Sequence, residues 1–215
     1  MDAIERLKLG YRDFCRDYFS GTDQTFKKLV SEGQNPKVLL IGCSDSRVSP
    51  CVITRAEPGE IFTIRNVANL VPPYSNDEGH HGVSAAIEFA VRALEVEHII
   101  VLGHSQCGGI YALLNGSVLG KKDSFISNWM QIAAPAKAYV DEHCQHMNLE
   151  EKAYACEQAA LKVSLDNLQT FPWVKQRIMT GKLKLHAWHF DLSSGKLLEL
   201  TPETNEFSAI LESEK

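Results

Sequence analysis

The chain has 215 residues and a formal net charge of −5, with 44% hydrophobic and 23% charged residues, which is ordinary for a soluble globular domain. Its 22 lysine and arginine residues form no block, so we expect no nucleic-acid partner bound through a basic face. No run approaches the roughly 18 apolar residues that a membrane-spanning helix needs, so we expect no membrane partner.

Helical periodicity marks the first part of the chain. Residues 2–19 carry apolar side chains every three or four positions, which predicts an amphipathic helix. A second helix is expected over about 22–31, and Gly33 ends it. We interpret 1–35 as a helical arm that packs on the domain or on its dimer partner, with 1–215 forming a single domain.

Short β-branched and leucine-rich runs then alternate with longer segments of helical periodicity. This alternation predicts an α/β fold, with a mostly parallel central sheet of four strands, a short antiparallel edge strand and flanking helices. The helices are expected at 81–95, from about 107, at 122–144 with a break near Pro135, at 149–169 and at 172–180. The strands are expected at 37–42, 61–65, 97–102 and 183–190, with the antiparallel edge strand at 197–200.

Two polar segments directly follow two of the predicted strands. One runs from Cys43 to Arg47 and includes Asp45, and the other contains His104 and Cys107. Carboxyl ends of parallel strands form the edge at which open α/β sheets bind ligands. Two thiols, an imidazole and a carboxylate at such an edge are a donor set that suits zinc. The alternative is that these are buried cysteines and a capping aspartate that never meet.

The order of these motifs resembles that of the β-class carbonic anhydrases. The resemblance covers roughly residues 25–195, nearly the whole chain. The sequences that carry it are CSDSRV at 43–48 and GHSQCGG at 103–109, with PGE at 58–60, RNVAN at 65–69 and SAAIE at 84–88 matching in the same order.

The resemblance implies a carbonic anhydrase, a lyase that hydrates CO2 reversibly to bicarbonate and a proton through a zinc-bound hydroxide. It implies one Zn²⁺ per chain, held by Cys43, His104 and Cys107. Asp45 would accept a hydrogen bond from the hydroxide, and Arg47 would hold Asp45 through a bidentate ion pair. In a closed state, released by Arg47, Asp45 would itself bind the metal. Taken alone, these two residues can also be a surface ion pair, usually worth less than ~1 kcal/mol.

Four residues match or suit a substrate pocket for CO2 and bicarbonate. By resemblance, Gln34, Phe62 and Val67 match pocket positions that often come from the partner subunit, although sequence alone favours ordinary core for Phe62 and Val67. Gly108 lets the backbone approach a ligand closely at a helix N-terminus. Many relatives carry a pocket tyrosine where this chain has Phe89, which removes a possible hydrogen bond. A pocket built partly by a neighbour predicts a homodimer or a dimer of dimers.

Two residues bear on regulation. In one branch of the family that this chain resembles, bicarbonate looks able to lock the closed site. It binds there at a second pocket that carries a tryptophan and a tyrosine. Leu40 and Phe190 occupy those positions here and offer neither an indole N–H nor a hydroxyl. We therefore expect Asp45 to stay off the metal near neutral pH, without sigmoidal inhibition by bicarbonate.

Other functions remain as alternatives. A hydrolase of CS2 or COS could use the same fold, and a noncatalytic zinc-stabilised interaction domain would need no Asp45–Arg47 pair. The six cysteines favour metal ligands and free thiols over a disulfide framework. Charges spread over residues 1–9 do not suit a secretory signal, which predicts a cytoplasmic location and leaves an organelle or carboxysome open.

Overall fold

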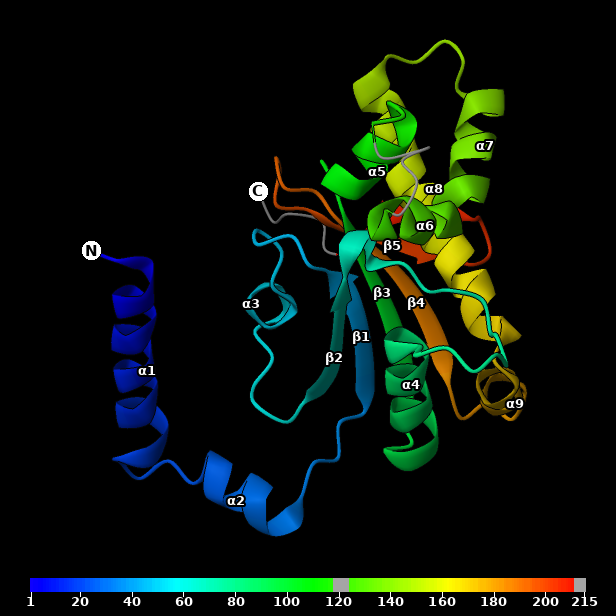
Figure 1. Cartoon of the computed structure of the whole chain (residues 1–215). Helices are drawn as coiled ribbons and strands as arrows, with labels where there is room; N and C mark the ends of the chain where they lie inside the picture. Colours follow the sequence, from blue (N-terminus) through cyan, green and yellow to red (C-terminus); the bar gives the residue numbers. More distant parts are fainter. Residues whose placement is uncertain (118–123, 211–215) are drawn as a thin grey trace.

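The computed structural model describes residues 1–117 and 124–210. These form one six-stranded sheet in the order β2-β1-β3-β4-β5-β6 (Figure 1). The first four strands in sequence run parallel, and β5 and β6 are antiparallel. The strands are β1 Val38–Cys43, β2 Ile61–Asn66, β3 His98–His104, β4 Lys184–Phe190, β5 Leu197–Thr201 and β6 Glu206–Ala209.

The predicted α/β fold with a mostly parallel four-stranded centre is confirmed, and the sheet has one strand more than expected. The return strand β5 is not the edge, because β6 pairs with it from Leu198↔Ala209 to Thr201↔Glu206. Phe207 is half-buried while the other three residues of β6 are exposed. A four-residue strand with one packed side chain gives almost no alternation, so the sequence pattern was too weak to reveal it.

Helices connect the strands much as the periodicity indicated. The expected helix at 81–95 is α4 followed by a π-helical turn, Phe89–Ala93. The segment expected at 122–144, whose positions 122 and 123 lie outside the described residues, divides before α7, and Pro135 occupies the first turn of α7. The helices are α1 Ala3–Phe19, α2 Thr25–Glu32, α3 Pro50–Thr54, α4 Gly82–Glu88, α5 Gly108–Leu114, α6 Phe125–Met130, α7 Ala134–His143, α8 Leu149–Thr170 and α9 Pro172–Met179.

The two faces of the sheet are covered differently. Alternate residues of β1 point to opposite faces, so Leu39 and Ile41 enter the main core with side chains of α4, α8 and α9. Leu40 enters a smaller cluster that includes Ile53 of α3. Full burial of an aliphatic side chain stabilises the fold by about 1.5–3 kcal/mol, so the main core carries most of the sheet's packing energy.

A third cluster lies beyond the carboxyl ends of the strands. Side chains of α5, α6, α7 and α8 pack there against Cys43 and Cys107. Helix α8 passes close to β3, because a Cβ at Gly103 would come within 3.2 Å of Leu161. The close packing of α8 on β3 therefore brings polar residues of this helix within reach of the strand ends.

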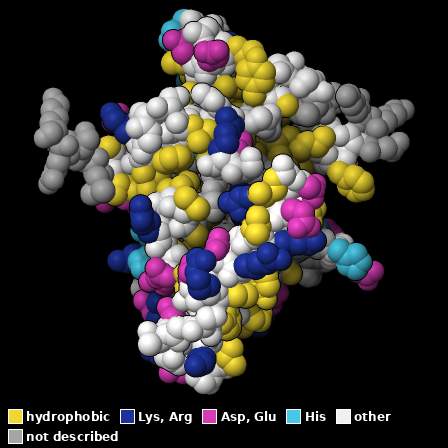
Figure 2. All heavy atoms as spheres, turned by 90° about the vertical axis from the view of Figure 1, so that its left-hand side faces the viewer, with side chains coloured by type: hydrophobic (Ala, Val, Ile, Leu, Met, Phe, Trp, Pro, Cys, Tyr) yellow, Lys and Arg dark blue, Asp and Glu magenta, His cyan; other side chains and the backbone are white. Residues whose placement is uncertain are grey.

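The N-terminal helices contrast with this packing. Neither α1 nor α2 has a buried residue, and Figure 1 shows α1 standing apart from the sheet. Phe14 contacts Phe26 with ring centroids 5.4 Å apart, which joins the two helices. Figure 2 looks from this side and shows hydrophobic side chains interspersed with charged ones. Among the described residues, no helix has both the length and the apolar character needed to cross a bilayer.

Candidate metal centre

Three soft donor side chains meet at the carboxyl end of the sheet. Cys43 is the last residue of β1, His104 is the last residue of the neighbouring β3, and Cys107 directly precedes α5. Their donor atoms all lie within 4.8 Å of one another, and all three residues are buried. The expectation that these residues meet is therefore correct, and three protein donors are the number with which catalytic zinc sites hold their ion.

The hydrogen bonding of His104 suits a metal ligand. Its Nδ1 lies 2.8 Å from the Ser105 carbonyl oxygen, which can only accept, so Nδ1 carries the proton. This fixes the tautomer in which Nε2 has a free lone pair. Nε2 is buried and has no hydrogen-bond partner among the residues that the structure describes. A buried nitrogen left unpaired is costly unless it binds something, and a metal ion beside two sulfur atoms satisfies it.

The two thiols show why a cation belongs between them. A hydrogen bond from Cys107, aided by His104, lowers the pKa of Cys43 to about 4. The same interaction with Cys43, together with burial, raises the pKa of Cys107. One thiolate therefore forms readily and the second is opposed by the first. A divalent cation removes that opposition, because it neutralises both charges and coordinates thiolate instead of thiol.

Asp45 and Arg47 form a bidentate ion pair beside the cluster. Arg47 donates from Nε to Oδ1 at 3.0 Å and from Nη2 to Oδ2 at 2.7 Å, and its backbone N–H also donates to Oδ1. These hydrogen bonds hold the pKa of the Asp45 carboxyl well below its usual range. Arg47 therefore engages both carboxylate oxygens of Asp45.

Arg47 also reaches the loop that carries Cys107. Its Nη2 donates to the Gln106 carbonyl oxygen at 3.1 Å. Gln106 has a φ of 60°, a left-handed conformation that non-glycine residues seldom adopt. The strained residue stands directly before Cys107, so this conformation sets the direction in which the chain enters α5.

Arg65, on the edge strand β2, holds the loop that follows β1. Its Nε donates to the Cys43 carbonyl oxygen at 2.9 Å, and its Nη2 donates to those of Asp45 at 2.8 Å and Val48 at 3.1 Å. From the sequence, Arg65 is part of the RNVAN motif at 65–69, without a role of its own. An arginine at the end of a predicted strand, next to a loop of polar residues, was the available signal.

A buried carboxylate and a buried imidazole hold the loop between β3 and α5. Glu157 of α8 and His189 of β4 are 3% and 0% exposed. The Cys107 backbone N–H donates to Glu157 Oε1 at 2.9 Å, and His189 Nε2 lies 3.2 Å from Oε2. Sequence reasoning missed both residues. A glutamate on the apolar side of the 149–169 pattern was a signal, since glutamate is rarely buried without a partner.

The candidate pocket residues lie at two ends of the sheet. Val67 follows β2, and its Cγ1 would lie 3.1 Å from a Cβ at Gly109, so it is close to the start of α5. Gly108 borders a cavity of about 560 Å³ that also includes Gln106 and Tyr111. In contrast, Gln34 precedes β1 and Phe62 lies near the start of β2, both towards the opposite end.

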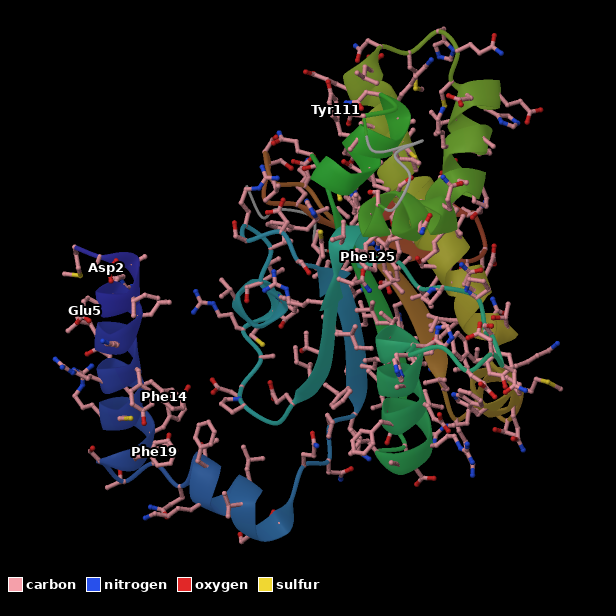
Figure 3. The ribbon with its side chains drawn as sticks, viewed as in Figure 1. Asp2, Glu5, Phe14, Phe19, Tyr111 and Phe125 are labelled. Carbon is pink, nitrogen blue, oxygen red and sulfur yellow. The ribbon has the colours of Figure 1, made fainter. Side chains whose placement is uncertain are left out.

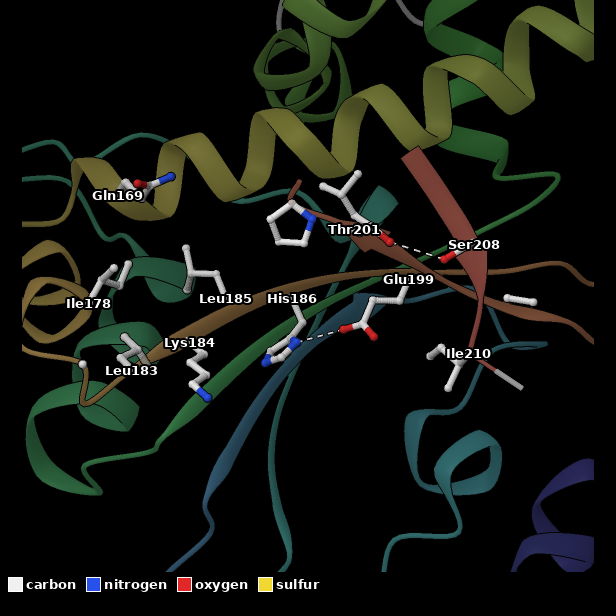
Figure 4. Close-up of a pocket in the computed structure, with 14 residues that line it drawn as sticks. Gln169, Ile178, Leu183, Lys184, Leu185, His186, Glu199, Thr201, Ser208 and Ile210 are labelled. Carbon is white, nitrogen blue, oxygen red and sulfur yellow. Dashed lines mark hydrogen bonds and ion pairs between the residues drawn. The ribbon is translucent and has the colours of Figure 1, made fainter. Parts of the chain in front are cut away.

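A separate hollow lies along β4, β5 and β6, with a volume of about 790 Å³ (Figure 4). His186 Nδ1 lies 2.9 Å from Glu199 Oε1 there, and Thr201 contacts Ser208. Cys43, His104 and Cys107 are not part of its lining. The residues for metal chemistry are therefore gathered at the strand ends and not in this hollow.

The two positions discussed for regulation are apolar in their surroundings. Leu40 is fully buried in a cluster with Ile100 and Leu102, and Phe190 packs against that cluster. Neither side chain brings a hydrogen-bond donor into it. Both side chains therefore pack with other hydrophobic residues, and the absence of regulation by bicarbonate stays a prediction.

Comparisons with known proteins agree with this geometry. The family model described as carbonic anhydrase matches residues 38–197. Beta carbonic anhydrase 3 of Arabidopsis thaliana is 40% identical over 197 residues, which are 91% of this chain and 76% of the relative. The solved β-carbonic anhydrase CcaA is 36% identical with a TM-score of 0.89, covering 98% of this chain and 93% of the other. One of two tetrameric β-carbonic anhydrases from the ascomycete Sordaria macrospora is 30% identical with a TM-score of 0.72, covering 92% and 93%.

Proposed function

The chain belongs to the β-class carbonic anhydrases, and on that premise we propose which of its residues carry the zinc and the reaction. As a member of this family it is a zinc enzyme that hydrates CO2 reversibly to bicarbonate and a proton. We assign one zinc ion per chain to Cys43, His104 and Cys107. The observation that carries the assignment is the buried Nε2 of His104, which has no hydrogen-bond partner among the described residues. It lies within 4.8 Å of the sulfur atoms of Cys43 and Cys107.

Bound zinc supplies Lewis acidity, which lets water react as hydroxide near neutral pH. We assign Asp45 to orient that nucleophile, because its carboxylate lies beside the cluster and can accept one more hydrogen bond. Arg47 keeps Asp45 in this role through the bidentate pair at 2.7 and 3.0 Å. If Arg47 releases the carboxylate, Asp45 becomes a competing metal ligand, which is the closed state.

We further propose that Gln34, Phe62, Val67 and Gly108 line the pocket for CO2 and bicarbonate. The positions of Val67 and Gly108 near the start of α5 support a contribution from the same subunit. Gln34 and Phe62 lie towards the opposite end of their own sheet, so their contribution requires a second copy of the chain.

The assembly that follows is a homodimer or a dimer of dimers, in which residues 1–35 of a single 1–215 domain pack on the partner. The exposed apolar side chains of α1 support this, since Leu7 is 67% and Tyr11 66% exposed in the single chain. The Sordaria relatives are described as tetrameric, which supports the larger assembly. Light scattering of the active enzyme measures the state, and an active monomer contradicts the proposal.

For the location we propose the cytoplasm, and the relatives described as mitochondrial and chloroplastic make an organelle the alternative to test. Fractionation of the source cells with an antibody to the full chain tests this. Recovery of the protein in an organelle or a carboxysome fraction contradicts it.

The assigned ligands are tested together with the reaction. Stopped-flow CO2 hydration is measured on metal-analysed protein, after chelation and after zinc is restored. We expect about one zinc per chain, loss of activity on chelation and its return with zinc. Hydrolysis of COS and CS2 by the same samples measures the alternative substrates. Full zinc occupancy after removal of the Cys107 thiol would sink the ligand assignment.

A further inference from the structure

The peptide unit between Gln106 and Cys107 is held at both of its polar atoms. Its carbonyl oxygen accepts from Arg47 Nη2 at 3.1 Å, and its N–H donates to Glu157 Oε1 at 2.9 Å. Gln106 is also the residue with a φ of 60°. A left-handed non-glycine residue persists only where its surroundings hold it, so these two hydrogen bonds oppose relaxation of the peptide.

The Glu157 end of this clamp is more deeply buried than the Arg47 end. The Glu157 side chain is 2% exposed, whereas the Arg47 side chain is 48% exposed. Glu157 Oε2 is in turn held by His189 Nε2 at 3.2 Å, from the neighbouring β4. Burial of a carboxylate is costly unless both oxygens have partners, and here each oxygen has one.

We propose that Glu157 is a positioning residue for the zinc centre, acting through the Cys107 N–H, with His189 holding its second oxygen. Glu157 holds the N–H of this peptide unit, and Arg47 holds its carbonyl oxygen. Glu157 thereby sets the position of the Cys107 sulfur atom. It also joins the Asp45–Arg47 pair to the buried pair through a single peptide unit. The inference rests on the proposed assignment of Cys107 as a ligand.

Two conservative variants separate position from charge. Glu157→Gln keeps an oxygen at the same reach for the Cys107 N–H. His189 can accept from the new amide in its other tautomer, which puts a proton on Nδ1, a buried atom without a partner among the described residues, so this variant should lose some stability. Glu157→Asp keeps the charge but withdraws the carboxylate by one methylene. If geometry is what matters, Glu157→Gln retains zinc affinity, and Glu157→Asp loses about 10- to 100-fold, the usual effect of a partner that orients a ligand.

Helix α8 also supplies a matched control. Ser164 is fully buried, and its Oγ accepts the Val71 backbone N–H at 3.3 Å, on a segment that carries none of the assigned ligands. Ser164→Ala therefore removes the same kind of contact from the same helix. Thermal unfolding should register a loss for both Ser164→Ala and Glu157→Asp, whereas only Glu157→Asp should weaken the zinc site.

The experiment uses full-length protein and two readouts besides activity. Zinc affinity is measured by competition with a chromogenic chelator, and the cobalt-substituted protein gives the thiolate-to-metal and ligand-field bands. The parent is measured first, because a parent without thiolate bands contradicts the ligand assignment itself. If Glu157→Asp does not fold, His189→Asn takes its place, since it removes the imidazole that holds Oε2.

The expected result is parent-like affinity and cobalt bands in Glu157→Gln and Ser164→Ala, with weaker affinity and shifted bands in Glu157→Asp or His189→Asn. Three results overturn the inference. These are parent-like affinity and bands in Glu157→Asp or its substitute, a loss in Glu157→Gln equal to that in Glu157→Asp, and an equal loss in Ser164→Ala.

Discussion

The carboxyl edge of the sheet and the N-terminal arm differ in how deeply a single chain buries their side chains. At the edge, Cys43, His104 and Cys107 are 5%, 1% and 2% exposed, and charged side chains hold the loops between them. In the arm, Ile4 is 57% and Leu7 67% exposed, and neither helix has a buried residue. The cluster of the three donor side chains comes from one chain, whereas the arm presents apolar surface that a single copy leaves in water.

The difference shows that amphipathicity tells which face of a helix is apolar but not what that face meets. Figure 3 shows Phe14 and Phe19 towards the end of α1 where the chain turns into α2, far from Tyr111 and Phe125 of the helical layer. Helices of this kind gain most of their stability by packing such a face against other parts of a protein, in the same chain or in another. The metal centre gives the predictions with the largest expected effects, and the arm gives a smaller one.

The largest effect is expected from Cys107→Ala. Bound zinc should fall from about one per chain to near zero, and stability should fall with it, because metal binding is linked to folding. Metal analysis and thermal unfolding measure this. Cys156→Ala is the matched control, since that thiol is also fully buried and burial raises its pKa to about 12, so it stays protonated. Equal zinc loss in both variants would contradict the assigned role.

Asp45→Asn should lower kcat by about a hundredfold while zinc stays bound, because it removes a charged acceptor beside the nucleophile. Stopped-flow rates with metal analysis on the same sample separate the two effects. Asp77→Asn provides the control, since Asp77 also has a pKa held below its usual range, through Ser75 and His81, but lies in an exposed loop. A near-normal kcat in Asp45→Asn shows that this carboxylate does not serve the reaction.

For the arm, Leu7→Gln should weaken self-association by about tenfold to a hundredfold, the effect of losing one buried leucine side chain. Sedimentation over a range of concentrations measures the dissociation constant. Arg12→Gln is the control, because it introduces the same glutamine side chain at an exposed position of the same helix. It should leave association unchanged. If both variants associate like the parent, the arm does not pack on a second copy.

The smallest effect is expected from bicarbonate. Leu40 and Phe190 pack as apolar core, so added bicarbonate should inhibit as a simple product, with a Hill coefficient of about one. Initial rates over a bicarbonate series at fixed pH give the coefficient. A sigmoidal curve together with Asp45 bound to the metal shows that other residues supply the donors that these two lack.

The strand ends were predictable because their signal is local. An apolar run of strand length followed by polar residues places Cys43 and His104 at the edge of a parallel sheet, and β1 and β3 are indeed neighbours. Proline and glycine gave their usual boundaries, with Pro135 in the first turn of α7 and Gly33 after α2. Each of these predictions depends on residues that are close in sequence.

The supporting residues were not predictable because their partners are distant. Glu157 is 50 positions from Cys107, and Arg65 is 22 positions from Cys43, so neither contact leaves a periodic trace. The left-handed Gln106 has no glycine to announce it. The arm is harder still, because Leu7 is exposed in the single chain and the sequence does not say what covers it. Long-range hydrogen bonds and subunit contacts are decided by the whole fold and not by local preference.

The three hydrogen bonds of Arg65 have a consequence for how the enzyme acquires its metal. They tie the carbonyl groups of Cys43, Asp45 and Val48 to β2 through contacts that involve no ligand atom. The segment from Cys43 to Val48 should therefore take its shape together with the sheet, without needing a bound ion. Little chain entropy then remains to be lost on loading, so zinc should enter a folded protein in a rapid, concentration-dependent step without a slow rearrangement after it.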